Sequence, residues 1–241
     1  MSKLLSSMFN RLVKWSMFWF VTVIFALISV LEVLQKKHMN QDFANLIFDF
    51  TNFLPIAVIA AAGIFISKDY ANNTIRNKII VGHKRSSIYI ANWILSACIS
   101  IIFFLALTAT AAVLGLTMLR TQQVSYNALL VNWLIGLLVM LVHSSIVTFI
   151  CMLGKGSSSV LLAILVHFLT LIMVTIAQLF EMFNNNKVSK FLLEFFPTNV
   201  IFKLNTYEII DNAALAAIYL TVIIAAVTLL GVYIFNRTDI K

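Results

Sequence analysis

Charged residues are scarce in this chain, and their scarcity sets the first limit on what it can be. Only 11% of its 241 residues are Asp, Glu, Lys or Arg, while 61% are hydrophobic. A soluble domain carries about 25% charged residues, so the composition indicates a membrane protein. Two Pro and seven Gly leave few helix breakers. The two cysteines, Cys98 and Cys151, fall inside apolar segments, where we expect packing roles rather than a disulfide.

Motifs for catalysis and metal binding are also missing from the sequence. The histidines form no HExxH motif, no cluster with cysteine and no i,i+4 pair with a carboxylate. No nucleophile is paired with a base, so an intramembrane enzyme is not expected, and neither is a metal site. His143 and His167 fall in apolar segments. They can share a polar patch, or each can be satisfied by a carbonyl or a serine on a neighbouring helix.

The sequence contains no energy source of its own. Carriers driven by protons or sodium normally hold an acidic residue near the bilayer midplane. Here Glu32 and Asp49 are expected near the outer ends of their apolar segments, and no charged residue is expected at a midplane. No selectivity sequence of a channel is visible. The phosphate-binding loop GxxxxGK[ST] is absent too, so any ATP must be hydrolysed by another chain.

Six apolar segments are present, each long enough for a transmembrane helix. A hydrocarbon core of about 30 Å needs about 20 apolar residues, and the segments are apolar on all faces. We therefore predict an all-α, polytopic fold with one membrane domain, residues 1–241. The predicted spans are residues 15–31, 50–67, 86–119, 121–154, 156–180 and 212–236.

The basic residues predict the orientation of these spans, because Lys and Arg collect on the cytoplasmic side. With both termini inside, the cytoplasmic segments hold eleven basic residues and two acidic ones, and the outer segments hold six basic and seven acidic ones. The net charge of +8 is thus explained by orientation, and no nucleic-acid partner is expected. The prediction is a multi-pass protein with both termini in the cytoplasm.

Three further features are predicted outside or at the edges of the spans. Residues 1–14 have apolar positions at helical spacing, which predicts an interfacial helix lying on the cytoplasmic leaflet. Pro55 is expected one turn inside the second span, as a local kink. The 34-residue third and fourth segments must tilt or extend beyond the bilayer. Residues 181–211 are too apolar for a solvated loop and predict a short helical hairpin in the outer leaflet, broken at Pro197.

The most informative segment is the basic loop of residues 67–85, SKDYANNTIRNKIIVGHKR. Ser67 is expected to cap a short helix, with Asp69 in its first turn and Gly82 at its end. Ile75, Ile79 and Ile80 give this helix an apolar edge, and its polar edge is formed by Asn72, Asn73, Arg76 and Lys78. Such a helix is suited to a groove on a cytoplasmic partner. The alternative is a solvated loop that only sets orientation.

The same loop resembles the segment after the second span in ABC-2 type permeases. The similarity lies in the stretches DYANNTIRNKII (69–80) and GHKRSSIY (82–89). The family pattern has an acid, an aromatic, Gly-Thr, two aliphatics and a turn with Pro and Arg. This chain has Asn73 in place of the Gly and no Pro before Arg85. The resemblance extends over the whole chain, including the motif FPTN (196–199) before the last span.

The resemblance implies a particular assembly. Two permease copies would pair with two cytoplasmic ABC ATPase subunits, which bind ATP and Mg²⁺, while this chain binds no cofactor. The basic loop would be the coupling helix that enters a groove of each ATPase. The coupling residues carried over from the family are Asp69, Asn73, Thr74, Ile75, Arg76 and Ile79.

The chain is most similar to small bacterial permeases for bacitracin resistance, lantibiotic immunity or export of phenol-soluble modulins. It is therefore expected in the bacterial plasma membrane, as the transmembrane subunit of an ATP-driven exporter for an amphipathic peptide or lipid-like antimicrobial. Substrate-binding residues are not indicated by the sequence. The alternative is a membrane scaffold or sensor subunit for peptide antibiotics that transports nothing.

Overall fold

The computed structural model describes residues 1–39, 48, 51–119, 125–184, 193, 196–205, 210 and 212–238. In these residues the secondary structure is helical, without strands, which confirms the all-α prediction. Six helices are long and apolar enough to cross a membrane, so the protein is a multi-pass membrane protein. They are α2 (Ser16–His38), α3 (Leu54–Ala71), α5 (Arg85–Met118), α6 (Tyr126–Gly154), α7 (Ser158–Asn184) and α10 (Ala213–Arg237).

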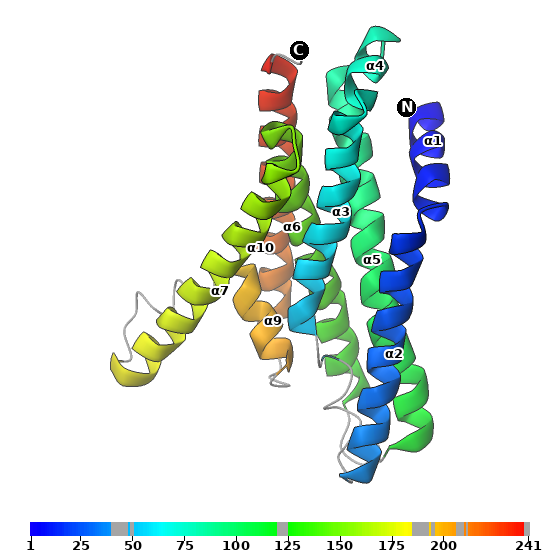
Figure 1. Cartoon of the computed structure of the whole chain (residues 1–241). Helices are drawn as coiled ribbons and strands as arrows, with labels where there is room; N and C mark the ends of the chain where they lie inside the picture. The colour runs from blue at the N-terminus through cyan, green and yellow to red at the C-terminus, as the bar shows by residue number, and fades with distance from the viewer. Residues whose placement is uncertain are drawn as a thin grey trace.

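The spans form a bundle with both ends of the chain on the same side (Figure 1). In the described part of the chain it is accompanied by the shorter α-helices α1 (Ser2–Val13), α4 (Thr74–Ile80) and α9 (Pro197–Asn205) and by the 3-10 turn η2 (Thr51–Phe53). Helices α3 and α6 pack at the centre and are the most buried spans, whereas α2, α7 and α10 are mostly exposed on the surface. Helix α7 slants away from the bundle, and α9 lies in the space between it and α3 (Figure 1). At 34 residues, α5 is about 50 Å long and exceeds a bilayer core, as expected.

Several predicted boundaries differ from the structure. Pro55 lies in the first turn of α3, where a missing N–H costs nothing, so the predicted kink inside the span is wrong. Helix α2 continues to His38, which places Glu32 well inside the helix and buries it. Helix α6 begins at Tyr126, later than predicted, and residues 121–124 lie outside the described part of the chain.

The predicted hairpin of residues 181–211 is described only in part. Helix α7 extends to Asn184, and α9 begins at Pro197, the residue at which the hairpin was predicted to break. Asn199 accepts a hydrogen bond from Gln178 of α7 at 3.0 Å and donates one to the carbonyl of Leu193 at 2.9 Å. The first of these bonds, which is partly buried, connects α9 to α7. Residues 185–192, 194–195, 206–209 and 211 lie outside the described residues.

Helix α1, predicted as an interfacial helix, has an apolar face that the protein itself covers. Leu4, Met8 and Leu12 are at most 4% exposed, because they pack onto the protein's own helices. Helix α1 runs alongside the upper part of the bundle instead of lying flat across its end (Figure 1). Its connection to α2 is a tight elbow, in which the indole nitrogen of Trp19 donates to the carbonyl of Val13 at 2.7 Å.

Candidate coupling site at the basic end

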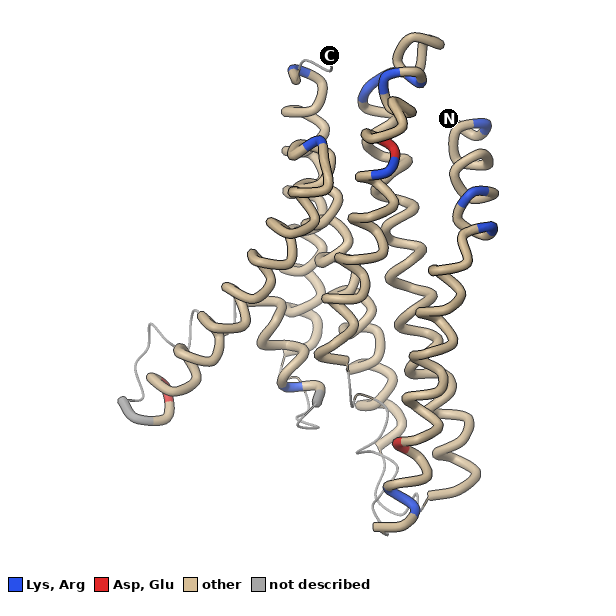
Figure 2. Tube along the Cα trace, viewed as in Figure 1, with Lys and Arg blue, Asp and Glu red and all other residues tan. Residues whose placement is uncertain are grey.

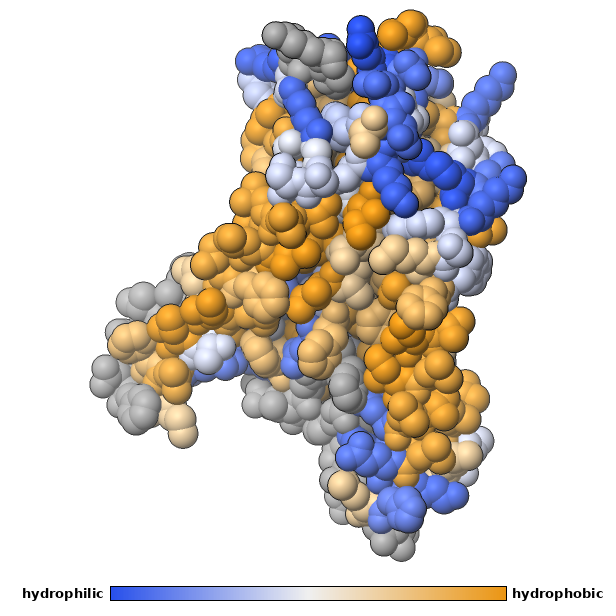
Figure 3. Space-filling view, viewed as in Figure 1, coloured by the Kyte–Doolittle hydropathy of each residue, from blue (hydrophilic) through white to orange (hydrophobic). Residues whose placement is uncertain are grey.

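Basic side chains gather at the end of the bundle that holds α4 and both chain ends (Figure 2). A space-filling view shows the same hydrophilic region above a broad apolar surface (Figure 3). Among the described residues at this end, Asp69 is the sole acidic one. The described basic residues there are Lys3, Arg11, Lys14, Lys68, Arg76, Lys78, Lys84, Arg85, Lys155 and Arg237.

Helix α4 is shorter than the sequence predicted, because α3 continues through Ser67 and Asp69 to Ala71. Asn73 follows α3 with a left-handed backbone (φ 53°), and its carbonyl accepts the first hydrogen bond of α4, from Asn77 at 2.9 Å. Ser67 therefore caps nothing, and its hydroxyl instead donates to the carbonyl of Gly156 at 3.1 Å. The late start of α4 and the missing Ser67 cap have one cause. Asn73 adopts the left-handed conformation that reverses the chain, and Asn tolerates this conformation.

The end of α4 matches the prediction that Gly82 terminates the helix. Gly82 has φ 96°, its N–H donates to Ile79 at 2.9 Å, and the N–H of His83 donates to Lys78 at 3.1 Å. This pair of bonds is the Schellman motif, which needs a residue with positive φ after the helix. Both ends of α4 are thus fixed by left-handed residues, and the helix has a defined orientation on the bundle.

Asp69 is the anchor that holds α4 and α1 to the end of α3. Its carboxylate is completely buried and forms ion pairs with Arg11 of α1 and Lys78 of α4, the latter at 2.9 Å. The Arg11 guanidinium also stacks over the ring of Phe65 at 4.0 Å. A buried carboxylate is tolerated only when it is paired. The Asp69 side chain therefore faces the interior of the protein, and its role in coupling stays a prediction.

The other predicted coupling residues are partly buried against the bundle and partly exposed. Ile75 is 1% exposed and packs into the core, so it too supports α4 from behind. Ile79 is half-buried against the same core, and Thr74 is also half-buried. Asn73 and Arg76 are exposed and remain candidates for contact with a partner.

Two residues outside the predicted coupling set form the apolar tip of the loop: Ile80, which the sequence placed on the apolar edge of the helix, and Val81, which it did not single out. Ile80 is 71% exposed and Val81 is 78% exposed, directly before Gly82. The sequence feature that could have identified them is Asn73. If α4 is taken to begin after Asn73, Ile75 and Ile79 lie on the side toward the bundle, and the last turn of the helix lies on the exposed side. The exposed surface of α4 is therefore Asn73, Arg76, Asn77, Ile80 and Val81, which we call the tip surface.

The histidine pair in the membrane bundle is the second polar feature that the sequence singled out. The rings of His143 on α6 and His167 on α7 lie 5.4 Å apart, centre to centre, so the two residues do share a patch. His143 Nδ1 lies 2.9 Å from the carbonyl oxygen of Val139. Both ring nitrogens of His167 are buried without a hydrogen-bond partner among the described residues. Within this part of the chain, no group of three or more potential metal ligands occurs.

Comparison with models of known protein families gives no match for this sequence, and comparison with curated proteins gives none either. The family resemblance thus depends on the loop residues and their setting between two spans.

Proposed function

We propose that the protein is the transmembrane subunit of an ATP-driven exporter of the ABC-2 type, with the tip surface docking on a separate cytoplasmic ATPase. One observation carries the proposal. A seven-residue helix between the second and third spans is fixed from behind by a buried ion-pair network and offers two exposed aliphatic residues at its far end. Exposed apolar residues ringed by polar ones are typical of interaction sites.

The connections of α4 make it suited to transmit force. Only the turn at Asn72 and Asn73 separates it from α3, and Lys78 ties it back to Asp69 of α3. On its other side, Arg85 begins α5 and donates to the carbonyls of Asn236, at 3.2 Å, and Thr238 at the end of α10. A push on the tip surface would therefore be passed to three spans rather than absorbed by a flexible loop.

The assembly would contain two copies of this chain and two ATPase subunits, which bind ATP and Mg²⁺, in the bacterial plasma membrane. The tip surface and both termini would face the cytoplasm, because the basic residues gather at that end. Closure of the ATPases would change the gap between the two permease copies and expel the cargo. An amphipathic peptide or lipid-like antimicrobial fits best, because the apolar spans offer no charged path for a hydrophilic solute.

The test compares one substitution at the tip surface with a matched control. Val81→Asp places a carboxylate in an apolar contact, at a cost of about 1–3 kcal/mol, which weakens docking about tenfold. Val13→Asp makes the same change at an exposed site on the same end of the bundle, outside α4. We expect Val81→Asp to abolish peptide-stimulated ATP hydrolysis by the reconstituted permease and ATPase, and Val13→Asp to leave it intact.

A photo-reactive amino acid at Val81 should also crosslink to an ATPase with a phosphate-binding loop, and one at Val13 should not. Wild-type export by Val81→Asp at normal abundance would remove the coupling role of α4. Specific ATPase docking without ATP-driven peptide movement into inverted vesicles would instead identify a sensor or scaffold subunit.

A further inference from the structure

A basic pocket of about 250 Å³ opens where α1, α2 and α3 meet. It is separate from the tip surface of α4, and one of its wall residues, Arg11, also pairs with Asp69. Three cations and two aromatic rings contribute to its walls, which are formed by Arg11, Lys14, Trp15, Phe65, Lys68 and Asn72. A water molecule takes up about 30 Å³ in the liquid, so the pocket has room for a polar group much larger than water.

The charges around this pocket do not balance. Arg11 is paired with Asp69, but Lys14 and Lys68 are exposed and form no ion pair with an acid in the described part of the chain. The ammonium of Lys68 lies 5.3 Å from the centre of the Trp15 ring, which holds it over the pocket. The pocket therefore offers a local excess of positive charge.

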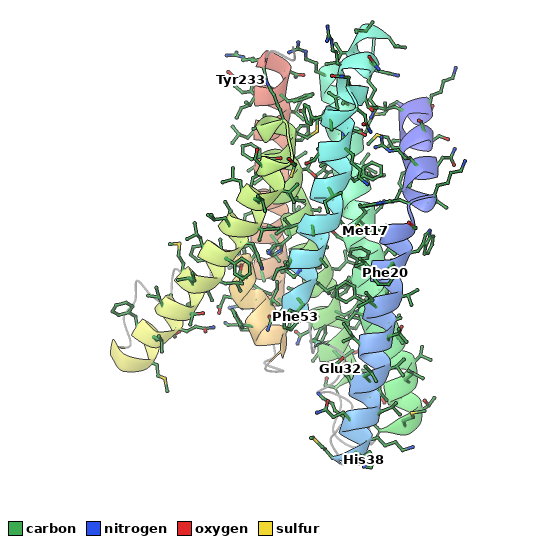
Figure 4. All side chains as sticks on the ribbon, viewed as in Figure 1. Met17, Phe20, Glu32, His38, Phe53 and Tyr233 are labelled. Atoms are coloured by element: carbon green, nitrogen blue, oxygen red, sulfur yellow. The ribbon has the colours of Figure 1, made fainter. Side chains whose placement is uncertain are left out.

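The position of the pocket along the bundle indicates which kind of anion could reach it. Met17 and Phe20 follow Trp15 on α2, and both are exposed apolar residues, 45% and 67% exposed (Figure 4). They belong to the apolar surface, which lies below a hydrophilic end of the molecule (Figure 3), and the basic residues of α1 precede Trp15 in the chain. Tryptophan is enriched at this boundary in membrane proteins. The pocket thus lies at the level of lipid headgroups.

We propose that this pocket binds the phosphate headgroup of an anionic phospholipid in the leaflet at the basic end. The phosphate would lie between Lys14 and Lys68, with Arg11 as a third cation, and the acyl chains would run along the apolar surface beside Met17 and Phe20. Basic pockets between transmembrane helices are known to suit such headgroups. The lipid would connect the elbow of α1 and α2 to the end of α3. This inference does not depend on an ATPase partner.

The experiment uses the full-length chain in nanodiscs, with phosphatidylcholine alone or mixed with phosphatidylglycerol. The double variant Lys14→Gln/Lys68→Gln removes two charges from the pocket. The control Lys3→Gln/Lys84→Gln removes two exposed charges from the same end, outside the pocket. All four lysines are exposed, so neither variant disturbs the packed core. Native mass spectrometry measures the affinity for phosphatidylglycerol, and thermal unfolding measures the stabilisation by the lipid.

A lysine near an anionic surface contributes about 1 kcal/mol, so the pocket variant should bind phosphatidylglycerol at least about tenfold more weakly. It should also lose the rise in melting temperature that the lipid gives the wild type. The control should retain both. Equal losses in the two variants would show diffuse surface attraction and overturn the proposal. So would binding of inorganic phosphate or an acidic peptide through the same lysines without a preference for phosphatidylglycerol over phosphatidylcholine.

Discussion

Replacing Asp69 with Asn removes one negative charge from a buried site and leaves the shape of the side chain nearly unchanged. The carboxylate is completely buried, and its partners Arg11 and Lys78 come from α1 and α4. Since the amide cannot form the ion pairs, both cations lose their counter-charge at once. We expect α1 and α4 to loosen from the end of α3, while the six spans remain folded.

The geometry of the two ion pairs determines the size of the effect. At 2.9 Å, a unit charge pair has a gross attraction of about 6 kcal/mol with an effective dielectric constant of about 20. Desolvation offsets much of this energy, and removing one partner of a buried pair costs about 3–5 kcal/mol in proteins. Arg11 is 40% exposed and keeps part of its hydration, so its contribution is smaller than that of Lys78, which is 13% exposed. We expect a net loss of about 2–4 kcal/mol.

Hydrogen–deuterium exchange of the purified chain in nanodiscs measures this loss where it occurs. Amides of α1 and α4 should exchange at least about tenfold faster in Asp69→Asn, because the free energy of local opening is lower. Glu181→Gln, the same chemical change near the end of α7, should leave both helices unaffected. In the double variant with Lys78→Met, the second substitution should add little to the first. Unchanged exchange of α1 and α4 in Asp69→Asn would refute the anchoring role.

The packing and the charge distribution lead to three more expected outcomes. Gly231→Ala should lower the melting temperature, because its Cβ would overlap the Tyr89 hydroxyl, whereas Gly156→Ala meets only the Ser158 hydroxyl at 4.0 Å and should be neutral. His167→Leu should raise the melting temperature, since burial of its two unpaired ring nitrogens costs about 1–3 kcal/mol. In a background without native cysteines, an impermeant maleimide should label Lys36→Cys from outside intact cells and should not label a cysteine in α4. The reverse pattern would invert the proposed orientation.

The number and type of the long helices were predictable from the sequence, because burial in lipid demands apolar residues on every face. All six predicted spans occur. Their ends were less predictable, and the errors have local causes. Apolar content marked the end of the first span at residue 31, but α2 continues through Glu32, Lys36 and Lys37 to His38. Backbone hydrogen bonding continues a helix past the residues that lipid requires, so hydropathy alone underestimates its length.

Hydropathy and periodicity could not predict what covers the apolar face of α1. Its periodicity indicated the helix and the buried side correctly, with Leu4, Met8 and Leu12 on one face. Periodicity says that such a face is covered, but not whether lipid or protein covers it. Here the protein itself covers it, and this packing brings Arg11 to Asp69. Without tertiary contacts, neither the pairing nor the basic pocket beside it was visible.

The same limit explains why the exposed apolar residues of α4 lie further along the helix than the coupling residues predicted from the sequence. The family resemblance assigned Asp69 to the coupling contact, and nothing local in the sequence indicated that Lys78 would fold back onto it. That return depends on the left-handed backbone of Asn73, which reverses the chain between α3 and α4. Once the chain turns there, Asp69 and Ile75 face the bundle, and Ile80 and Val81 face away from it. Substitutions at Asp69 or Ile75 should therefore change the stability of the loop. Substitutions at Ile80 or Val81 should change only the proposed docking on the ATPase.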